Sequence, residues 1–207
     1  MKRYLLLLLV AVPAAHADTV PMESFQDCLD GARSGVAAER AALACTTVLD
    51  SRSIQPERVA DFVAARADNF VRLGKFEDAL ADYDRALARR TSDESLYRRR
   101  CHARAIWGRE LFAALTDCDT ALQMAGDDRK ALADRALVHF RRADYPAARA
   151  DEDAVLAKTP ADARSLYLRG LTRLKTGDKA GGDADVAAAT AVDTKIADTY
   201  AGYGVTP

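Results

Sequence analysis

The amino-acid sequence predicts an all-α protein, folded as a curved array of about five helix–turn–helix units with a short helix closing the C-terminal end. Its composition favours helix, because the 207 residues are rich in Ala, Leu, Arg and Asp and include only 6 Pro and 11 Gly. No stretch has the pattern of a series of strands. Small residues recur at nearly regular intervals, which indicates a repeated structural unit.

The first residues, "MKRYLLLLLVAVPAAHA", have the features of an export signal. Two basic residues precede an apolar run, and the small residues Ala15 and Ala17 then flank His16. A membrane anchor is the alternative, but the apolar run is well short of the roughly 20 residues that a bilayer span requires. We therefore expect cleavage after Ala17 and a periplasmic or secreted product, residues 18–207, forming a single repeat domain. No Cys follows the cleavage site, which argues against a lipid anchor.

The charge balance gives no support to a nucleic-acid or membrane partner. The whole chain has a formal charge of −1, and removal of Lys2 and Arg3 with the signal would leave −3. A slightly acidic chain lacks the positive field that attracts nucleic acid or anionic lipid. The sequence also contains no pattern that implies a cofactor.

The repeats are defined by small residues with nearly constant spacing. The anchor positions are Ala41, Ala79, Ala114, Ala148 and Gly182, separated by 38, 35, 34 and 34 residues. A second small residue precedes each turn by seven positions, at Cys28, Ala67, Cys101, Ala136 and Gly170. Apolar residues lie at helical spacing on both sides of each turn, which predicts two amphipathic helices per unit.

The stretch "ADNFVRLGKFEDALADYDRALARR" resembles the tetratricopeptide repeat, a family of 34-residue helical hairpins. Its matching positions are Gly74, Phe76, Ala79, Tyr83 and Ala86. The resemblance covers units at 22–55, 60–93, 94–128, 129–162 and 163–195, of which the first is the most divergent. It implies a right-handed α-solenoid whose concave groove is lined by the first helices. The final "IADTYAGYGV" is expected to form the capping helix.

An arginine and an aspartate recur together in the last four units. Arg precedes the small residue of the first helix, and Asp follows the anchor of the second helix by three positions; the sets are Arg66, Arg100, Arg135 and Arg169 with Asp82, Asp117, Asp151 and Asp185. The first unit lacks both. We interpret them as a structural ladder of Arg–Asp pairs, either within one hairpin or between neighbouring hairpins. Another aspartate two residues further on (Asp84, Asp119, Asp153) is expected to face elsewhere.

The four cysteines fall into two pairs with one pattern. Cys28 and Cys45, like Cys101 and Cys118, are 17 residues apart, and each pair occupies the two slots where the hairpin is tightest. Both cysteine-bearing units also have one extra residue in the turn. Closely packed helices and an exported chain favour disulfides, so we expect Cys28–Cys45 and Cys101–Cys118. Each disulfide would close a short loop and stabilise the folded state by about 3 kcal/mol.

Catalytic and metal-binding roles for the cysteines have weaker support. A metal site favours cysteines two to four residues apart or clustered histidines, and a dithiol redox site favours C-x-x-C. Neither spacing occurs, and no His and acid are placed beside a Cys as a nucleophile requires. The sequence predicts neither a catalytic residue nor a metal ligand.

The expected concave groove is basic with interspersed apolar residues. The positions expected to line it are Arg98, His102, Lys130, Phe140, Arg141, Arg164, Tyr167 and Lys175. Such a face fits an extended protein or peptide segment with acidic and apolar groups, and the alternative is a solvated positive face without a partner. Some tetratricopeptide proteins clamp acidic C-terminal peptides through paired Lys and Asn. The matching slots here lack Asn, so that specificity is not transferred.

These observations favour an exported, non-enzymatic scaffold that binds a protein or peptide partner. One alternative is a thiol-redox or metal-binding factor that uses Cys101 and Cys118. Another is a self-associating structural protein, because Tyr200 and Tyr203 would be exposed aromatic residues if the cap were loose. Trp107, beside the turn, is interpreted as turn packing or as a partner anchor. The oligomeric state is not predicted.

Overall fold

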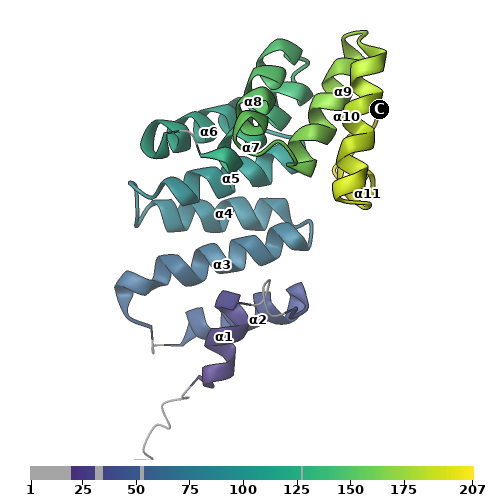
Figure 1. Cartoon of the computed structure of the whole chain (residues 1–207). Coiled ribbons are helices and arrows are strands. Elements are labelled where there is room, and N and C mark those ends of the chain that lie inside the picture. Colours follow the sequence, from purple (N-terminus) through teal and green to yellow (C-terminus); the bar gives the residue numbers. More distant parts are fainter. Residues whose placement is uncertain (1–19, 31–34, 52–53, 127) are drawn as a thin grey trace, which may run out of the picture.

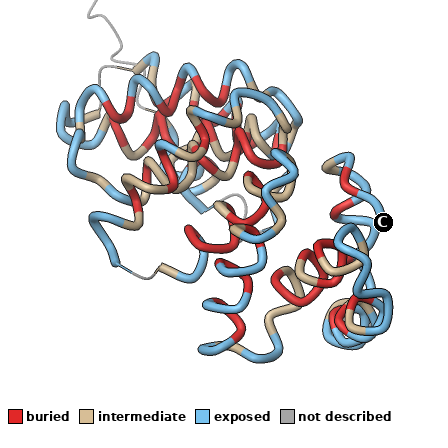
Figure 2. The backbone as a smooth tube through the Cα atoms, turned by 90° about the horizontal axis from the view of Figure 1, so that it is seen from above, coloured by how far each residue is buried: buried red, intermediate tan, exposed pale blue. Residues whose placement is uncertain are grey.

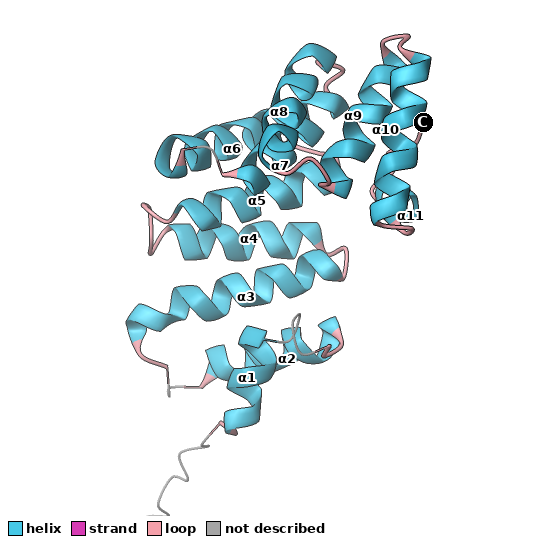
Figure 3. Cartoon of the chain, viewed as in Figure 1, coloured by secondary structure: helices cyan, strands magenta, loops and turns pink. Residues whose placement is uncertain are grey.

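The computed structural model describes residues 20–30, 35–51, 54–126 and 128–207, and this part of the chain consists of helices and turns without strands (Figure 3). The expected export signal at 1–17 lies outside it. The elements are α1 (Met22–Asp30), α2 (Ala38–Asp50), η1 (Pro56–Arg58), α3 (Val59–Arg72), α4 (Phe76–Leu87), α5 (Glu94–Trp107), α6 (Leu111–Ala125), α7 (Arg129–Arg141), α8 (Tyr145–Lys158), α9 (Ala163–Lys175), α10 (Lys179–Val192) and α11 (Ile196–Gly202).

The helices are arranged as consecutive pairs, from α1 with α2 to α9 with α10, that stack into a curved array (Figure 1). First helices of neighbouring pairs contact each other, whereas within the described residues no second helix packs against the second helix of the next pair. The first helices therefore line the concave side, and the second helices form the outer side. Buried residues alternate with exposed residues along the helices, as expected for stacked amphipathic hairpins (Figure 2). Each expected unit encloses one pair, except that α3 begins one residue early.

Aspartate caps mark the beginnings of many helices. In each case the carboxylate accepts a hydrogen bond from a backbone N–H group in the first turn, and the caps are Asp93 for α5, Asp128 for α7, Asp144 for α8, Asp162 for α9 and Asp178 for α10. A side-chain cap of this kind contributes about 1 kcal/mol. Aspartates between the units and in the turns within them thus help to define where the helices begin.

The two helices of a pair approach most closely at the small residues. Ala136 of α7 and Ala148 of α8 are completely buried. In the last pair the approach is closer still, because a Cβ added to Gly182 would lie 2.9 Å from the carbonyl oxygen of Gly170. Larger side chains at these positions would force the helices apart, so the recurring small residues set the distance between the helices.

The turns within the pairs use the left-handed backbone conformation. The residues are Gly35, Gly74, Gly108, Ala143 and Gly177, with φ between 58° and 91°. Ala143 is the one residue of this set that is not glycine. A side chain with a Cβ in the left-handed conformation destabilises the folded state by about 1 kcal/mol. In the longer turn of the third unit Glu110 also has positive φ, 53°, and it accepts a hydrogen bond of 3.0 Å from Arg104. This second left-handed residue accommodates the extra turn residue.

Each arginine of the ladder binds the aspartate of its own hairpin with two hydrogen bonds. Arg135 Nε and Nη2 donate to the Asp151 carboxylate oxygens at 2.8 and 2.7 Å. The same bidentate arrangement joins Arg66 to Asp82, Arg100 to Asp117 and Arg169 to Asp185. These carboxylates are nearly buried, so each pair ties a first helix to its second helix at a defined register.

The same arginines also reach back to the preceding hairpin. Arg135 Nη1 donates to Asp119 at 2.7 Å, and the corresponding contacts are Arg100 to Asp84, Arg169 to Asp153 and Arg66 to the hydroxyl of Thr46. Both alternatives considered for the ladder therefore occur, one for each edge of the guanidinium. Asp84, Asp119 and Asp153 do lie on another face of their helices, and each accepts a hydrogen bond from the ladder arginine of the following hairpin.

The sulfur atoms of the cysteines are joined in two disulfides, in the pairs expected from the 17-residue spacing. Cys28 of α1 and Cys45 of α2 have Cα atoms 4.7 Å apart, and Cys101 of α5 and Cys118 of α6 have Cα atoms 5.4 Å apart. These distances lie within the range that a disulfide spans. The bridges therefore fasten the first and third hairpins at their tightest point.

A buried glutamate occupies the same slot in the fourth unit. Glu152 aligns with Tyr83 and Cys118, is 1% exposed, and its carboxylate oxygens have no hydrogen-bond partner among the described residues. Burial raises the pKa of Glu152 well above its usual range, and the nearby Ser165 and Arg164 offset this only in part. Glu152 is therefore a source of pH-dependent stability in the fold.

The ladder is tested by two double-mutant cycles that share Arg135→Gln. With Asp151→Asn we expect a coupling free energy of about 1–3 kcal/mol in urea unfolding, because the Asp151 side chain is only 8% exposed. With Asp119→Asn we expect less than about 1 kcal/mol, because that side chain is 50% exposed. Equal couplings in the two cycles would contradict this account of the ladder.

The turn geometry predicts opposite effects of two matched substitutions. Ala143→Gly should raise the free energy of unfolding by about 1 kcal/mol, because it relieves a left-handed alanine. Gly74→Ala should lower the free energy of unfolding by a similar amount. An added Cβ at this position meets no atom within 4 Å, so the effect comes from backbone strain alone. Chemical denaturation checks both, and a loss of stability in Ala143→Gly would refute the explanation.

The raised pKa of Glu152 predicts that the free energy of unfolding depends on pH differently in the wild type and in variants that lack this carboxyl group. A carboxyl group with a raised pKa binds its proton more tightly in the folded state, so stability falls as pH rises from about 4.3 towards the raised pKa, by up to about 1.4 kcal/mol per pH unit. Glu152→Gln should remove this fall. Glu152→Val, which copies Val186 in the same slot of the fifth unit, should remove it too. Unfolding measured between pH 5 and 8 checks this, and parallel curves for wild type and both variants would count against it.

Candidate binding surfaces on the concave face

The first helices are connected across the concave face by ionic contacts. Arg99 of α5 donates through Nε to Asp68 of α3 at 3.0 Å. His102 Nδ1 of α5 lies 2.8 Å from Asp134 Oδ1 of α7, and Arg164 of α9 donates to that same oxygen at 2.9 Å. The concave face thus carries its own series of contacts, separate from the Arg–Asp ladder.

Asp134 is the central acceptor of this series, and its side chain is 1% exposed. Burial alone would raise its pKa, but His102 and Arg164 outweigh that effect and lower the pKa of Asp134 to about 2. The carboxylate is therefore ionised at all ordinary pH values. Sequence reasoning missed Asp134, although it lies two residues before Ala136, in the slot that Arg99 occupies in the third unit.

The expected basic groove is not an open basic surface, which corrects the sequence-based interpretation. Arg98 lies 3.7 Å from Asp128, while His102 and Arg164 both contact Asp134. Of the eight expected groove residues, only Lys130 and Lys175 are exposed. The physical reason is that Asp128 and Asp134 neutralise Arg98 and Arg164. The sequence-based list counted basic positions without these acidic neighbours.

The apolar groove positions are also covered. Tyr167 is 3% exposed and its ring centroid lies 5.0 Å from that of Tyr200. Phe140 packs edge-on against Tyr145, at a centroid distance of 5.7 Å. Arg141 donates a 3.0 Å hydrogen bond to the carbonyl oxygen of Ile106 at the end of α5. The part of the concave face formed by α7 and α9 is therefore filled by side chains of the protein itself.

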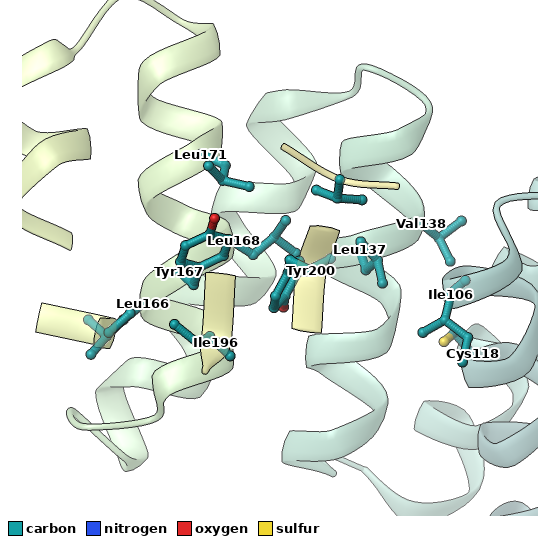
Figure 4. Close-up of a cluster of buried hydrophobic side chains, with 14 of the residues drawn as sticks. Ile106, Cys118, Leu137, Val138, Leu166, Tyr167, Leu168, Leu171, Ile196 and Tyr200 are labelled. Carbon is teal, nitrogen blue, oxygen red and sulfur yellow. The ribbon is translucent and has the colours of Figure 1, made fainter. Parts of the chain in front are cut away.

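The C-terminal tyrosines are not an exposed patch, which corrects a second expectation. Tyr200 is 2% exposed and lies in the cluster of buried apolar side chains beside Leu137 and Leu168 (Figure 4). Tyr203 is half-buried. The chain folds back after α11, where Val205 N–H donates to the Tyr200 carbonyl oxygen at 2.9 Å. This contact removes the sequence-based reason for self-association through these tyrosines.

An open hollow of about 350 Å³ lies on the concave face at the N-terminal end of the array. It is bounded by α1, η1, α3 and α5, and its lining includes Leu29, Arg58, Asp61, Asp68, Asn69 and Arg99. The lining presents both charge signs and the apolar side chains of Leu29 and Ala65. Sequence reasoning missed this hollow because it took groove positions from the three later units. In the second unit the slots of Arg99 and His102 hold Ala65 and Asp68, and the small alanine leaves space.

Trp107 packs at the turn end of its helix. Its ring stacks on Phe76 with centroids 5.8 Å apart, and the Arg109 guanidinium lies 5.0 Å from its ring centroid. These contacts agree with the turn-packing interpretation.

The metal-binding and thiol alternatives depend on where ligands and sulfur atoms lie. The described residues contain no group of three or more His, Cys, Asp or Glu placed to hold a metal ion. Cys101 and Cys118 have no exposed surface and are bonded to each other, so thiol chemistry at this pair would first require reduction. Among the helices of this part of the chain, none combines the length and apolarity needed to cross a bilayer.

No family model and no curated protein matches the sequence. Solved structures do resemble the fold. TTC0263, a tetratricopeptide-repeat protein from Thermus thermophilus, has a TM-score of 0.69 at 16% identity, covering 89% of this chain and 98% of its own. MamA residues 41 to the end, from Desulfovibrio magneticus RS-1, gives 0.67 at 11% identity, covering 86% and 98%. YrrB, described as a tetratricopeptide-repeat protein with an unusual peptide-binding site, gives 0.60 at 16% identity, covering 82% and 84%.

At these identities the likeness concerns the arrangement of the helices. The paired helices, the small residues at their closest approach and the inner layer of first helices agree with it. Similar folds carry many functions, so an activity has to be argued from this chain's own surfaces. The chain has the tetratricopeptide-repeat fold.

Proposed function

We propose that this chain is an exported scaffold that binds a protein or peptide segment on its concave face and has no catalytic activity of its own. The observation that carries the proposal is the open hollow bounded by α1, η1, α3 and α5. Export is supported by the signal pattern of residues 1–17. A concave site between repeated first helices is also the usual place for a partner in stacked-repeat proteins.

The lining of the hollow indicates the chemistry of the partner. Arg58 is 50% exposed, and its guanidinium lies 3.5 Å from Asp61, a partly exposed carboxylate. Exposed pairs of this kind contribute little to stability, about 0–1 kcal/mol, so a partner's charges replace them at low cost. The partner that fits best is an extended segment with an acidic group for Arg58 and an apolar group for Leu29.

YrrB supports the proposal by analogy only, because it is described as binding a peptide and shares the fold. The expectation of an acidic partner is retained, but its site moves from the later units to the N-terminal end. The reason is electrostatic, since Asp128 and Asp134 already neutralise arginines of the later units. The absence of catalysis is part of the proposal and is supported by the lack of a placed nucleophile in the sequence.

The experiment is affinity capture from the exported fraction of the native host, using residues 18–207 as bait. Arg58→Glu should weaken capture of the partner at least about tenfold, equivalent to about 1.4 kcal/mol. Quantitative mass spectrometry of the eluted proteins gives the measurement, and a purified partner is then titrated to obtain its Kd.

The matched control is Arg149→Glu on α8, in the outer layer. Arg149 is 53% exposed and lies 3.6 Å from Asp153, so it resembles Arg58 in exposure and pairing. This control should capture the partner as the wild type does. If Arg58→Glu captures the same proteins in the same amounts, or if both variants lose them equally, the hollow is not the binding site.

A further inference from the structure

The C-terminal segment Ile196–Val205 occupies the concave surface of α7 and α9. Ile196, Tyr200 and Val205 are all at most 4% exposed, and they share one buried cluster with Leu137 of α7 and with α9 side chains. Figure 4 shows Tyr200 lying between Leu137 and Leu168. The segment therefore covers positions where the sequence placed a partner.

Each polar contact of this segment with the array joins one side chain to one backbone carbonyl oxygen. Tyr200 Oη donates to the carbonyl oxygen of Arg164 at 3.2 Å. Arg141 Nη2 donates to the carbonyl oxygen of Tyr203 as well as to that of Ile106. The Arg141 contact uses a backbone carbonyl of the segment, and the other contact needs only a tyrosine hydroxyl. Another segment with a tyrosine and suitable apolar anchors therefore makes the same contacts.

Arg141 lacks a negatively charged partner in this arrangement. Within the described residues it forms no ion pair, and its Nε is buried without any hydrogen-bond acceptor. Burial lowers the pKa of Arg141, with no carboxylate to oppose the effect. A half-buried guanidinium bound only to carbonyl oxygens gains a stronger, charge-assisted contact when a carboxylate becomes available.

The segment is joined to the array by a short connection and a short helix. Residues 193–195 link α10 to α11, and α11 has seven residues. Among the helices of the described chain, the backbone of α11 comes close only to α9 and α10, and its contact with α7 is made by side chains. A terminal element whose backbone has few neighbours opens at a lower free energy than the stacked pairs, so its opening does not require the array to unfold.

We propose that the surface of α7 and α9 is a second docking site, that Ile196–Val205 fills it in the free protein, and that its partner is a peptide carrying an aliphatic residue, a tyrosine four positions later and a carboxylate that reaches Arg141. The partner displaces the C-terminal segment because it supplies the carboxylate that this segment lacks. The site is separate from the hollow at α1, η1, α3 and α5.

The probe for this proposal is an acetylated peptide with the sequence of residues 196–203, which ends in a free carboxylate where the Tyr203 carbonyl contacts Arg141. The same peptide with a C-terminal amide is its control. Tyr200→Ala in the mature chain weakens the resident segment, which competes at high effective concentration. Calorimetric titration should show the acid peptide binding Tyr200→Ala at least tenfold more tightly than wild type, and at least tenfold more tightly than the amide does.

Two further variants test whether the preference for the acid peptide depends on Arg141 and whether the gain in affinity is specific to Tyr200. Arg141→Gln in the Tyr200→Ala background should abolish the difference between acid and amide peptides. Tyr97→Ala, a tyrosine on α5 whose hydroxyl contacts Thr91, should leave the wild-type affinity unchanged. Equal binding of acid and amide, or equal binding to wild type and Tyr200→Ala, overturns the proposal.

Hydrogen exchange on the wild type provides a test that needs no variant. Saturating acid peptide should release the amide of Val205, now bonded to Tyr200, and raise its exchange rate at least tenfold. Unchanged protection with bound peptide also overturns the displacement mechanism. Failure here leaves the proposed function intact, because Arg58→Glu reports on the other end of the array.

Discussion

The close approach of two helices at a pair of small residues is the constraint on which the rest of this structure depends. A single hairpin cannot bury both of its apolar faces, so it has to stack on its neighbours. Stacking at a constant period requires the same distance between the helices in every unit, and Ala136 with Ala148, or Gly170 with Gly182, provides it. At this separation a guanidinium spans two carboxylates, and two cysteines come within bonding distance.

The central slot of the hairpin shows how one geometric position accepts different chemistry. It holds the disulfide-bonded Cys45 and Cys118 in two units, Tyr83 in another, and the buried Glu152 and then Val186 in the last two. The Arg–Asp ladder is present in units with and without a disulfide. The ladder therefore sets the register of the two helices in a hairpin and adds a weaker contact to the preceding hairpin, and the slot residue adjusts the stability of its own hairpin.

The concave face is divided into two parts by the chain's own residues. At the N-terminal end, small and polar side chains of α3 leave an open hollow. At the C-terminal end, Asp134 contacts both His102 and Arg164, and α11 covers the apolar positions. Partner binding is thus limited by self-contacts of the groove as well as by its composition.

The sequence by itself determined the helical class, the repeat period, the cysteine pairs and the recurring Arg–Asp set, because these depend on spacing within one hairpin or between adjacent ones. It also indicated which residues face inward. Only the tertiary structure decided which inward residues are free. Asp134 meets Arg164 and Tyr200 meets Tyr167 through contacts spanning 30 or more residues, and the curvature of the array sets such contacts. Local periodicity carries no information about that curvature, so the open surface could be located only in the folded chain.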